Sequence, residues 1–181
     1  MKAILGGRIV TPSAIVDGMA VLFEDRILDL VPESAVPEQA EKIRANGNYV
    51  LPGLVDMHIH GYLGADASDG TAEGLKTMAE GVAKNGVTSF LPTTMTVSYP
   101  ELRKAFAEIR LAMRESAQDA WNGAQIMGAN AEGPFINAGK KGAQAGEHVK
   151  KGDAAFLKEY ADVIRVFTIA PEVEGNLDCI R

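Results

Sequence analysis

Two histidines stand one residue apart at the end of an apolar run, in the segment LPGLVDMHIHG at residues 51–61. Side chains alternate between the two faces of a β-strand, so Asp56, His58 and His60 would share one face. Two imidazoles about 6–7 Å apart along a strand can converge on a metal ion. The pattern also fits a pair of hydrogen-bonded histidines at a strand end. The position after a predicted buried strand favours the metal site.

A second group of polar residues lies in the segment GANAEGPFINAGKKGAQ, residues 128–144. Glu132 ends a predicted strand, and the Gly-Pro that follows stops the strand. Taken alone, Glu132 is also typical of a solvated glutamate before a turn, and the loop after it of a flexible surface segment. Because the carboxyl ends of parallel strands meet at one edge of a sheet, we predict that Glu132, His58 and His60 face one cavity.

The elements that must position these residues alternate between strand and helix after residue 50. Thr71 has the type and place of a helix cap, and Ser98 with Glu101 has the spacing of a capping box. Apolar residues then recur at helical spacing after both caps. The predicted strands cover residues 49–60, 87–94, 124–132 and 163–171, and the predicted helices begin at Thr71, Ser98 and Asp153.

This alternation is typical of parallel βα units, which build both open doubly wound sheets and (β/α)8 barrels. The absence of GxGxxG or P-loop spacing weakens the case for a nucleotide-binding sheet. Four βα units are half of a (β/α)8 TIM barrel, whose active sites lie where the strands end. Polar residues cluster at the ends of the predicted strands: His58, His60, Thr93, Thr94, Asn130, Glu132 and Glu172. The barrel is therefore the favoured fold for residues 51–181.

Residues 1–50 have a different sequence pattern, in which short apolar runs are interrupted by glycine, proline and aspartate. A Glu-Asp-Arg turn at residues 24–26 predicts a β-hairpin. The Asn-Gly-Asn turn at residues 46–48 marks the boundary to the strand–helix region. We therefore predict a small β module over residues 1–50.

The composition limits the partners of the chain. A formal net charge of −6 and a pI near 5.1 argue against nucleic acid and anionic membranes, although they permit a small anionic ligand. The single cysteine, Cys179, excludes an internal disulfide and fits a reducing compartment. The N-terminal apolar run is too short for a signal peptide, and no apolar run is long enough for a membrane helix. We expect a cytoplasmic protein.

The segment PGLVDMHIHG, followed by EGPFINAGKKGAQ, resembles the N-acetylglucosamine-6-phosphate deacetylase family of the amidohydrolase superfamily. The first motif is shared with dihydroorotases, hydantoinases and many deaminases, whereas the second is specific to the deacetylases. The resemblance extends over the whole chain. It implies a (β/α)8 barrel of the amidohydrolase type that carries a small β-sandwich. Residues 1–50 would be the N-terminal part of this sandwich, and residues 51–181 the first half of the barrel.

The resemblance also implies a reaction and its site. The reaction is hydrolysis of the acetamide of N-acetylglucosamine 6-phosphate to glucosamine 6-phosphate and acetate. Glu132 matches the family's glutamate metal ligand, and His58 and His60 match a pair that binds a further metal in two-metal members. Ala143 and Gln144 match positions that touch the sugar. Histidine and glutamate ligands suit zinc, with iron or manganese as alternatives.

The resemblance places further functional residues beyond the fourth strand. Two more metal histidines, the catalytic aspartate and the phosphate-binding residues would follow Arg181, and the remaining histidine, His148, matches no ligand position. Asn130 and Gln144 stand where relatives carry histidine. We therefore expect an incomplete fragment that is inactive alone and prone to self-association, and a homodimer for the complete enzyme.

Two other functions stay open. A dihydroorotase- or deaminase-type amidohydrolase would share the HxH motif, and a panel of substrates would distinguish it. A non-catalytic half-barrel that acts as a binding module is favoured by the missing ligands. The length of the intact gene product would distinguish that reading.

Overall fold

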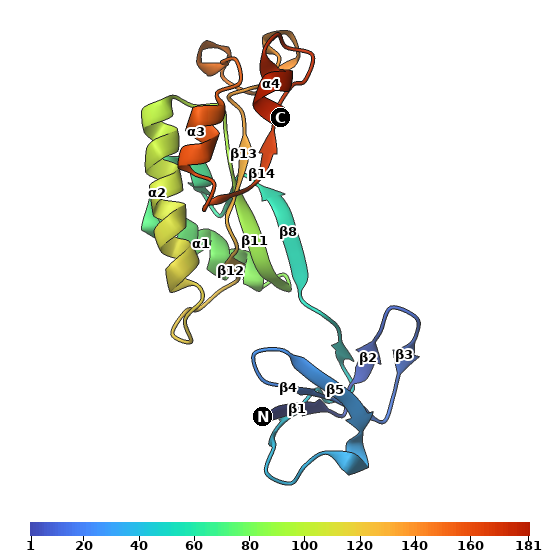
Figure 1. Ribbon diagram of the computed structural model, residues 1–181. Helices are drawn as coiled ribbons and strands as arrows, with labels where there is room; N and C mark the ends of the chain where they lie inside the picture. Colours follow the sequence, from blue (N-terminus) through green and yellow to red (C-terminus); the bar gives the residue numbers. More distant parts are fainter. The chain divides into compact units, whose positions relative to one another are not determined.

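The computed structural model describes all residues from Met1 to Arg181, and the chain divides into two compact units between Pro52 and Gly53 (Figure 1). The first unit is built of short strands, and the second alternates strands with helices. The sequence predicted that the alternation of strands and helices begins after residue 50.

Two small sheets make up the first unit. One has the strand order β5-β4-β1-β6 and the other β3-β2-β7. The predicted hairpin at residues 24–26 is confirmed, because β4 and β5 pair antiparallel on either side of this turn. Buried residues alternate along β1 and β4, so one face of their sheet forms the core of the unit. The strands are β1 (Lys2–Leu5), β2 (Arg8–Val10), β3 (Ile15–Val16), β4 (Met19–Phe23), β5 (Ile27–Pro32), β6 (Glu41–Arg44) and β7 (Tyr49–Val50), with the 3-10 helix η1 (Glu33–Ala35).

A parallel sheet of five strands forms the centre of the second unit. Strand β11 pairs with β8, β12 and β13, and β13 pairs with β14, all in parallel. The predicted α/β class with a parallel sheet is therefore confirmed. A short antiparallel pair, β9 with β10, follows β8. The strands are β8 (Leu54–Ile59), β9 (Gly61–Tyr62), β10 (Ala65–Asp66), β11 (Val87–Thr94), β12 (Gln125–Ile126), β13 (Ala129–Glu132) and β14 (Ile164–Thr168).

Three expectations about these strands need correction. The strand predicted over residues 49–60 is interrupted at Pro52-Gly53, and the strand predicted over 124–132 is interrupted at residues 127–128, where Gly128 has a φ of +146°. The expectation that the first of them is a buried strand does not hold for β8 in this chain. Within this chain β8 pairs with β11 alone, and Val55 and Met57 are 65% and 61% exposed.

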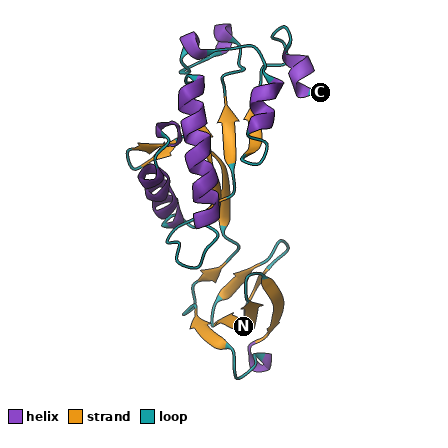
Figure 2. Cartoon of the chain, turned by 60° about the vertical axis from the view of Figure 1, so that its left-hand side comes forward, coloured by secondary structure: helices purple, strands orange, loops and turns teal.

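The predicted helix starts are confirmed. Thr71 Oγ1 accepts a hydrogen bond from the amide of Gly74 at 3.2 Å, Ser98 and Glu101 form the capping box, and Asp153 caps α3. Helices α1, α2 and α3 cover one face of the sheet (Figure 2). None of the helices combines the length and apolar character that a membrane crossing requires. The helices are α1 (Ala72–Ala83), α2 (Tyr99–Glu115), α3 (Ala154–Glu159) and α4 (Asn176–Ile180), with the 3-10 helices η2 (Ala67–Asp69), η3 (Ala138–Lys140) and η4 (Gly146–His148).

The core of the second unit lies between these helices and the sheet. An aromatic cluster joins α2 to α3, with the rings of Tyr99 and Phe156 stacked at 4.3 Å and Phe106 packed against Phe156 and Tyr160. Burial and the neighbouring carboxylate of Asp153, which accepts a hydrogen bond from the phenol, raise the pKa of Tyr99 to about 12. The cluster fixes α2 and α3 to each other.

Strand alternation separates this core from the opposite face of the sheet. Ala129 and Ala131 belong to the core, so Asn130 and Glu132, which alternate with them along β13, point away from the helices. Ile59 packs against the same core, which turns its neighbours His58 and His60 to the opposite face. The packing of small apolar residues against the helices therefore selects the face that carries the polar residues.

Replacing Phe106 by alanine is expected to lower the free energy of unfolding by about 3–5 kcal/mol, because Phe106 is 1% exposed and its removal leaves a cavity in the core. The matched control is Leu111→Ala on the same helix, where the side chain is 50% exposed and a change within about 0.5 kcal/mol is expected. Urea unfolding of both variants measures the difference. Equal losses would contradict the placement of the core.

Candidate metal centre

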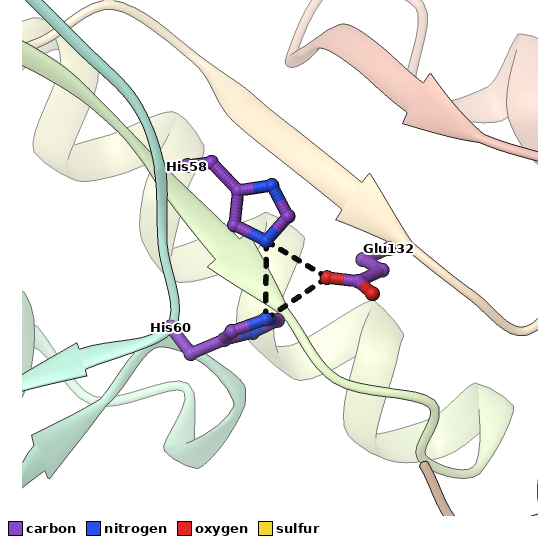
Figure 3. Close-up of side chains that lie close together, drawn as sticks. All are labelled: His58, His60 and Glu132. Carbon is purple, nitrogen blue, oxygen red and sulfur yellow. Dashed lines mark hydrogen bonds and ion pairs between the residues drawn. The ribbon is translucent and has the colours of Figure 1, made fainter. Parts of the chain in front are cut away.

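Three side chains that can bind a metal converge on one face of the parallel sheet. His58, His60 and Glu132 each offer a ligand atom, and these atoms all lie within 4.8 Å of one another (Figure 3). The two Nε2 atoms are 3.2 Å apart, and each lies 2.9 Å from Glu132 Oε2. The imidazole rings meet edge to face, with centroids 5.1 Å apart. The structure thus brings together the three residues that the sequence predicted as metal ligands.

The strands that carry these ligands are not neighbours in the sheet. His58 is on β8 and His60 directly follows it, Glu132 ends β13, and β11 lies between the two strands. Strands in a sheet are about 4.8 Å apart, so β8 and β13 are separated by about twice that distance. Imidazole and glutamate side chains are long enough to meet above the intervening strand. The site therefore depends on the curvature and register of three strands together.

A backbone carbonyl fixes the orientation of His60. Its Nδ1 lies 3.1 Å from the carbonyl oxygen of Thr93, and since that oxygen can only accept, Nδ1 carries the proton. Nε2 of His60 is then left with a lone pair directed at Glu132 and His58. A metal-binding histidine ordinarily donates its second nitrogen to such an acceptor. The contact presents His60 in the tautomer that a metal requires.

The electrostatics of the three groups favour a cation between them. Glu132 Oε2 is buried without a hydrogen bond, and its two contacts with the imidazoles, at 2.9 Å, are ion-pair contacts. The ligand atoms of a tetrahedral zinc site are about 3.3 Å apart, given bonds of about 2.0–2.1 Å. The observed separations of 2.9–3.2 Å are close to this spacing. The donor set and its spacing therefore fit a divalent metal ion.

Solvent reaches the cluster from the side of His58. The side chains of His58, His60 and Glu132 are 54%, 31% and 23% exposed. Asp56 does not join them, although it lies two residues before His58, because its Oδ1 accepts a hydrogen bond from the His58 amide at 3.0 Å. His148 lies in η4 and is not part of the cluster.

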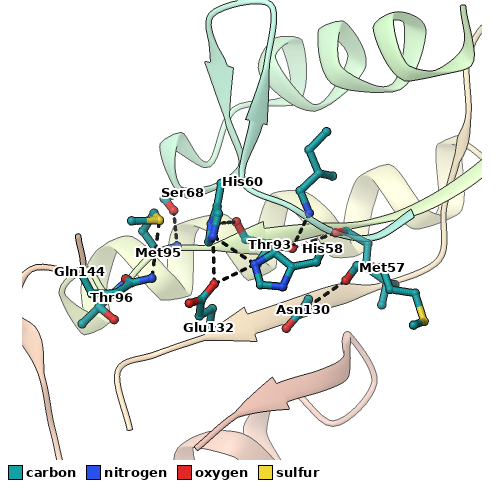
Figure 4. A network of polar contacts seen from close by, with 12 residues as sticks. Met57, His58, His60, Ser68, Thr93, Met95, Thr96, Asn130, Glu132 and Gln144 are labelled. Carbon is teal, nitrogen blue, oxygen red and sulfur yellow. Dashed lines mark hydrogen bonds and ion pairs between the residues drawn. The ribbon is translucent and has the colours of Figure 1, made fainter. Parts of the chain in front are cut away.

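The family resemblance assigned Gln144 to a contact with the sugar. In the structure, the side chain of Gln144 binds other residues of the protein. It is 6% exposed, and its Oε1 accepts a hydrogen bond from the backbone amide of Thr96 at 2.6 Å (Figure 4). Its Nε2 lies 3.8 Å from Met95 Sδ. This side chain fastens the loop after β13 to the end of β11, and the exposed Ala143 precedes it in that loop.

Sequence reasoning assigned no role to several residues that support the site. Ser68 Oγ accepts a hydrogen bond from the amide of Met95 at 2.8 Å, and Asn130 Nδ2 donates to the carbonyl of Met57 at 2.9 Å. Gly133 has a φ of +74°, and a β-carbon there would collide with Thr96 Oγ1, so the turn after Glu132 requires glycine. The Gly-Pro sequence signalled this turn, whereas nothing local signalled the contacts of Ser68 and Asn130.

Comparison with known proteins identifies the family. Residues 49–176 match the model of the amidohydrolase family, which is well over half of the chain. The chain is 30% identical over 179 residues to N-acetylglucosamine-6-phosphate deacetylase of Bacillus subtilis (strain 168), and this match covers 96% of the chain and 45% of that protein. It is 33% identical over 160 residues to N-acetylgalactosamine-6-phosphate deacetylase of Escherichia coli O157:H7, covering 86% of the chain and 41% of that protein.

A solved structure gives the same assignment. The crystal structure of N-acetylglucosamine-6-phosphate deacetylase from Pasteurella multocida is similar with a TM-score of 0.84 and 28% identity, covering 98% of this chain and 46% of that one. The parallel α/β sheet with His58, His60 and Glu132 on one face lies within the matched region. The chain belongs to the amidohydrolase family. It spans less than half of the length of each of these relatives.

Replacing Glu132 by glutamine is expected to weaken zinc binding by more than about 100-fold, because an amide is a much poorer ligand than a carboxylate. Loss of a group that only supports a ligand already lowers metal affinity by about 10–100-fold. Calorimetric titration of the metal-free protein with zinc measures the affinity. The control is Glu115→Gln at the exposed end of α2, which should bind zinc like the wild type. Equal zinc affinities for the two variants would rule out Glu132 as a ligand.

Proposed function

We propose that this chain provides metal-binding and substrate-contacting residues of a deacetylase that hydrolyses the N-acetyl group of N-acetylglucosamine 6-phosphate to glucosamine 6-phosphate and acetate. The observation that carries the proposal is the convergence of His58, His60 and Glu132 on one face of the sheet. The relatives named as deacetylases of N-acetylated sugar phosphates support the reaction and the substrate class.

The proposed architecture is the first half of a (β/α)8 barrel, formed by residues 51–181, with residues 1–50 as the N-terminal part of a β-sandwich. The order of the parallel strands supports the barrel: β8, β11, β13 and β14 are neighbours in the order in which they follow along the chain. Such an order arises when each βα unit is added on the same side of the last. The two small sheets of Met1–Pro52 support the sandwich.

The metal we propose is zinc, with iron or manganese as alternatives, held by His58, His60 and Glu132. Nitrogen and carboxylate ligands at this spacing suit zinc. When bound there, a divalent ion would supply Lewis acidity that polarises the amide carbonyl and lowers the pKa of a water molecule toward 7.

The other proposed roles belong to the protein's own residues. The carbonyl of Thr93 keeps the proton of His60 on Nδ1, and the carboxylate of Glu132 would offset half of the charge of a divalent cation. We assign Ala143 and Gln144 to the contact with the sugar, where the bond from the Thr96 amide to Gln144 holds the loop at the end of β11. We further propose that the enzyme acts in the cytoplasm as a homodimer.

The protein at the full length encoded by its gene should release acetate from N-acetylglucosamine 6-phosphate when it is loaded with zinc. Glu132→Gln should lower kcat/KM at least about 100-fold, because the change removes a ligand of the group that activates the amide. Acetate release, measured by a coupled assay, gives the rates, and Glu115→Gln is again the control that should keep full activity.

A panel of substrates separates this proposal from other functions. N-acetylgalactosamine 6-phosphate tests the identity of the sugar, and dihydroorotate, hydantoin and adenosine test other amidohydrolase reactions. A higher kcat/KM for one of these would replace the proposed substrate. No turnover of any of them by zinc-loaded protein would favour a non-catalytic binding module.

A further inference from the structure

The strand that carries the two histidines leaves regular pairing just before it reaches them. Asp56 of β8 is paired with Phe90 of β11, and the next pair is Ile59 with Pro92. Three steps along β8 therefore oppose two steps along β11, which is a β-bulge at Met57 and His58. Pro92 lacks an N–H group, so β11 cannot donate a backbone hydrogen bond at that position. A bulge redirects side chains, and here it lies at the first ligand of the candidate metal centre.

Two polar side chains bind the bulged strand where backbone hydrogen bonds are missing. Thr93 Oγ1, on β11, accepts a hydrogen bond from the amide of Ile59 at 3.0 Å. Asn130 Nδ2, on β13, donates to the carbonyl of Met57 at 2.9 Å (Figure 4). The second bond is unusual because β13 is not a neighbour of β8, and the amide of Asn130 reaches over β11 to make it.

We propose that Asn130 is a positioning residue of the metal centre, which ties the bulge before His58 to the strand that carries Glu132 and so sets the distance between these two ligands. The proposal rests on the proposed metal-binding function of the site. Asn130 precedes Glu132 by two residues on the same strand face, and Met57 directly precedes His58. A single hydrogen bond thus joins the backbone next to His58 to the strand that carries Glu132.

The choice of residue supports a positioning role over simple packing. Asn130 is 3% exposed, and its Oδ1 is buried without a hydrogen-bond partner. A buried acceptor without a partner is unfavourable, and an aliphatic side chain such as those of Ala129 and Ala131 would avoid it. What the asparagine contributes is its Nδ2 donor, which aliphatic side chains lack. An unpaired Met57 carbonyl in the bulge would leave β8 free to shift relative to β13.

The first test follows backbone amide exchange in the metal-free protein. Asn130→Leu keeps the approximate size of the side chain and removes the donor, and Asn130→Asp replaces the donor by a carboxylate oxygen, in case the leucine variant does not fold. Amides of residues 58–60 should exchange at least about tenfold faster in these variants, while the amide of Phe90 in β11 should be unaffected. The matched control is Thr94→Val, which removes a buried hydroxyl that has no partner and should leave exchange at residues 58–60 unchanged.

The second test measures cobalt binding to the folded proteins and separates positioning from general stability. Asn130→Leu should bind cobalt about 10–100-fold more weakly and change its visible absorption spectrum, the usual effect of disturbing a support of a metal ligand. Thr94→Val should keep the wild-type affinity and spectrum. If Asn130 contributed only to stability, Asn130→Leu would lower the midpoint of unfolding and leave the cobalt affinity and the spectrum unchanged.

The two tests distinguish failure of this inference from failure of the proposed function. Unchanged exchange at residues 58–60 in the Asn130 variants overturns the inference, and so does cobalt affinity within twofold of the wild type. A wild-type protein that binds no cobalt overturns the metal centre itself. The exchange experiment then still decides whether Asn130 holds the bulge.

Discussion

The candidate metal centre depends on a carboxylate oxygen held beside two imidazole nitrogens. Glu132 Oε2 is buried without a hydrogen bond, and both Nε2 atoms lie 2.9 Å away. Removal of a carboxylate from water is unfavourable unless positive charge or hydrogen-bond donors replace the water. With the proton of His60 kept on Nδ1 by the Thr93 carbonyl, that ring offers Oε2 a lone pair and no donor. A cation among the three groups would therefore stabilise the arrangement.

Packing on the other side of the sheet is what keeps these groups together. Ala129 and Ala131 are buried against the helices, and their small side chains allow close approach of the helical layer. Because side chains alternate along a strand, a shift of β13 by one residue would place Glu132 in the apolar core. That outcome is strongly unfavourable for a carboxylate, so core packing and site geometry select the same register.

Local signals in the sequence were sufficient for the starts of three helices in the second unit. Thr71, Ser98 and Asp153 cap helices where their spacing predicted, because a cap is an interaction within four residues. The alternation of β13 likewise placed Glu132 on the face of His58 and His60. The apolar run at residues 54–59 does not by itself reveal that β8 pairs with β11 alone, since such a run has the same composition in a central strand and in an edge strand.

Contacts between distant residues also escaped prediction. Asn130 and Met57 are 73 residues apart, and Gln144 and Thr96 are 48 residues apart. Such bonds follow from the curvature of the sheet and from the bulge, neither of which has a local signature at these positions. The bulge also explains why Asp56 bonds the His58 amide and does not join the cluster, although simple alternation placed it on the same face.

The two buried side-chain amides beside the cluster add no charge to it. Asn130 and Gln144 use their polar atoms on the backbones of Met57 and Thr96, and neither carries a charge. Glu132 is the single carboxylate among the three ligand residues, and the nearby carboxylate of Asp56 accepts a hydrogen bond from the His58 amide. Imidazole binds a metal in its neutral form, so a divalent cation held by His58, His60 and Glu132 would leave one net positive charge. Such a charge favours reactions in which negative charge develops on a carbonyl oxygen, and hydrolysis of an acetamide is one of these.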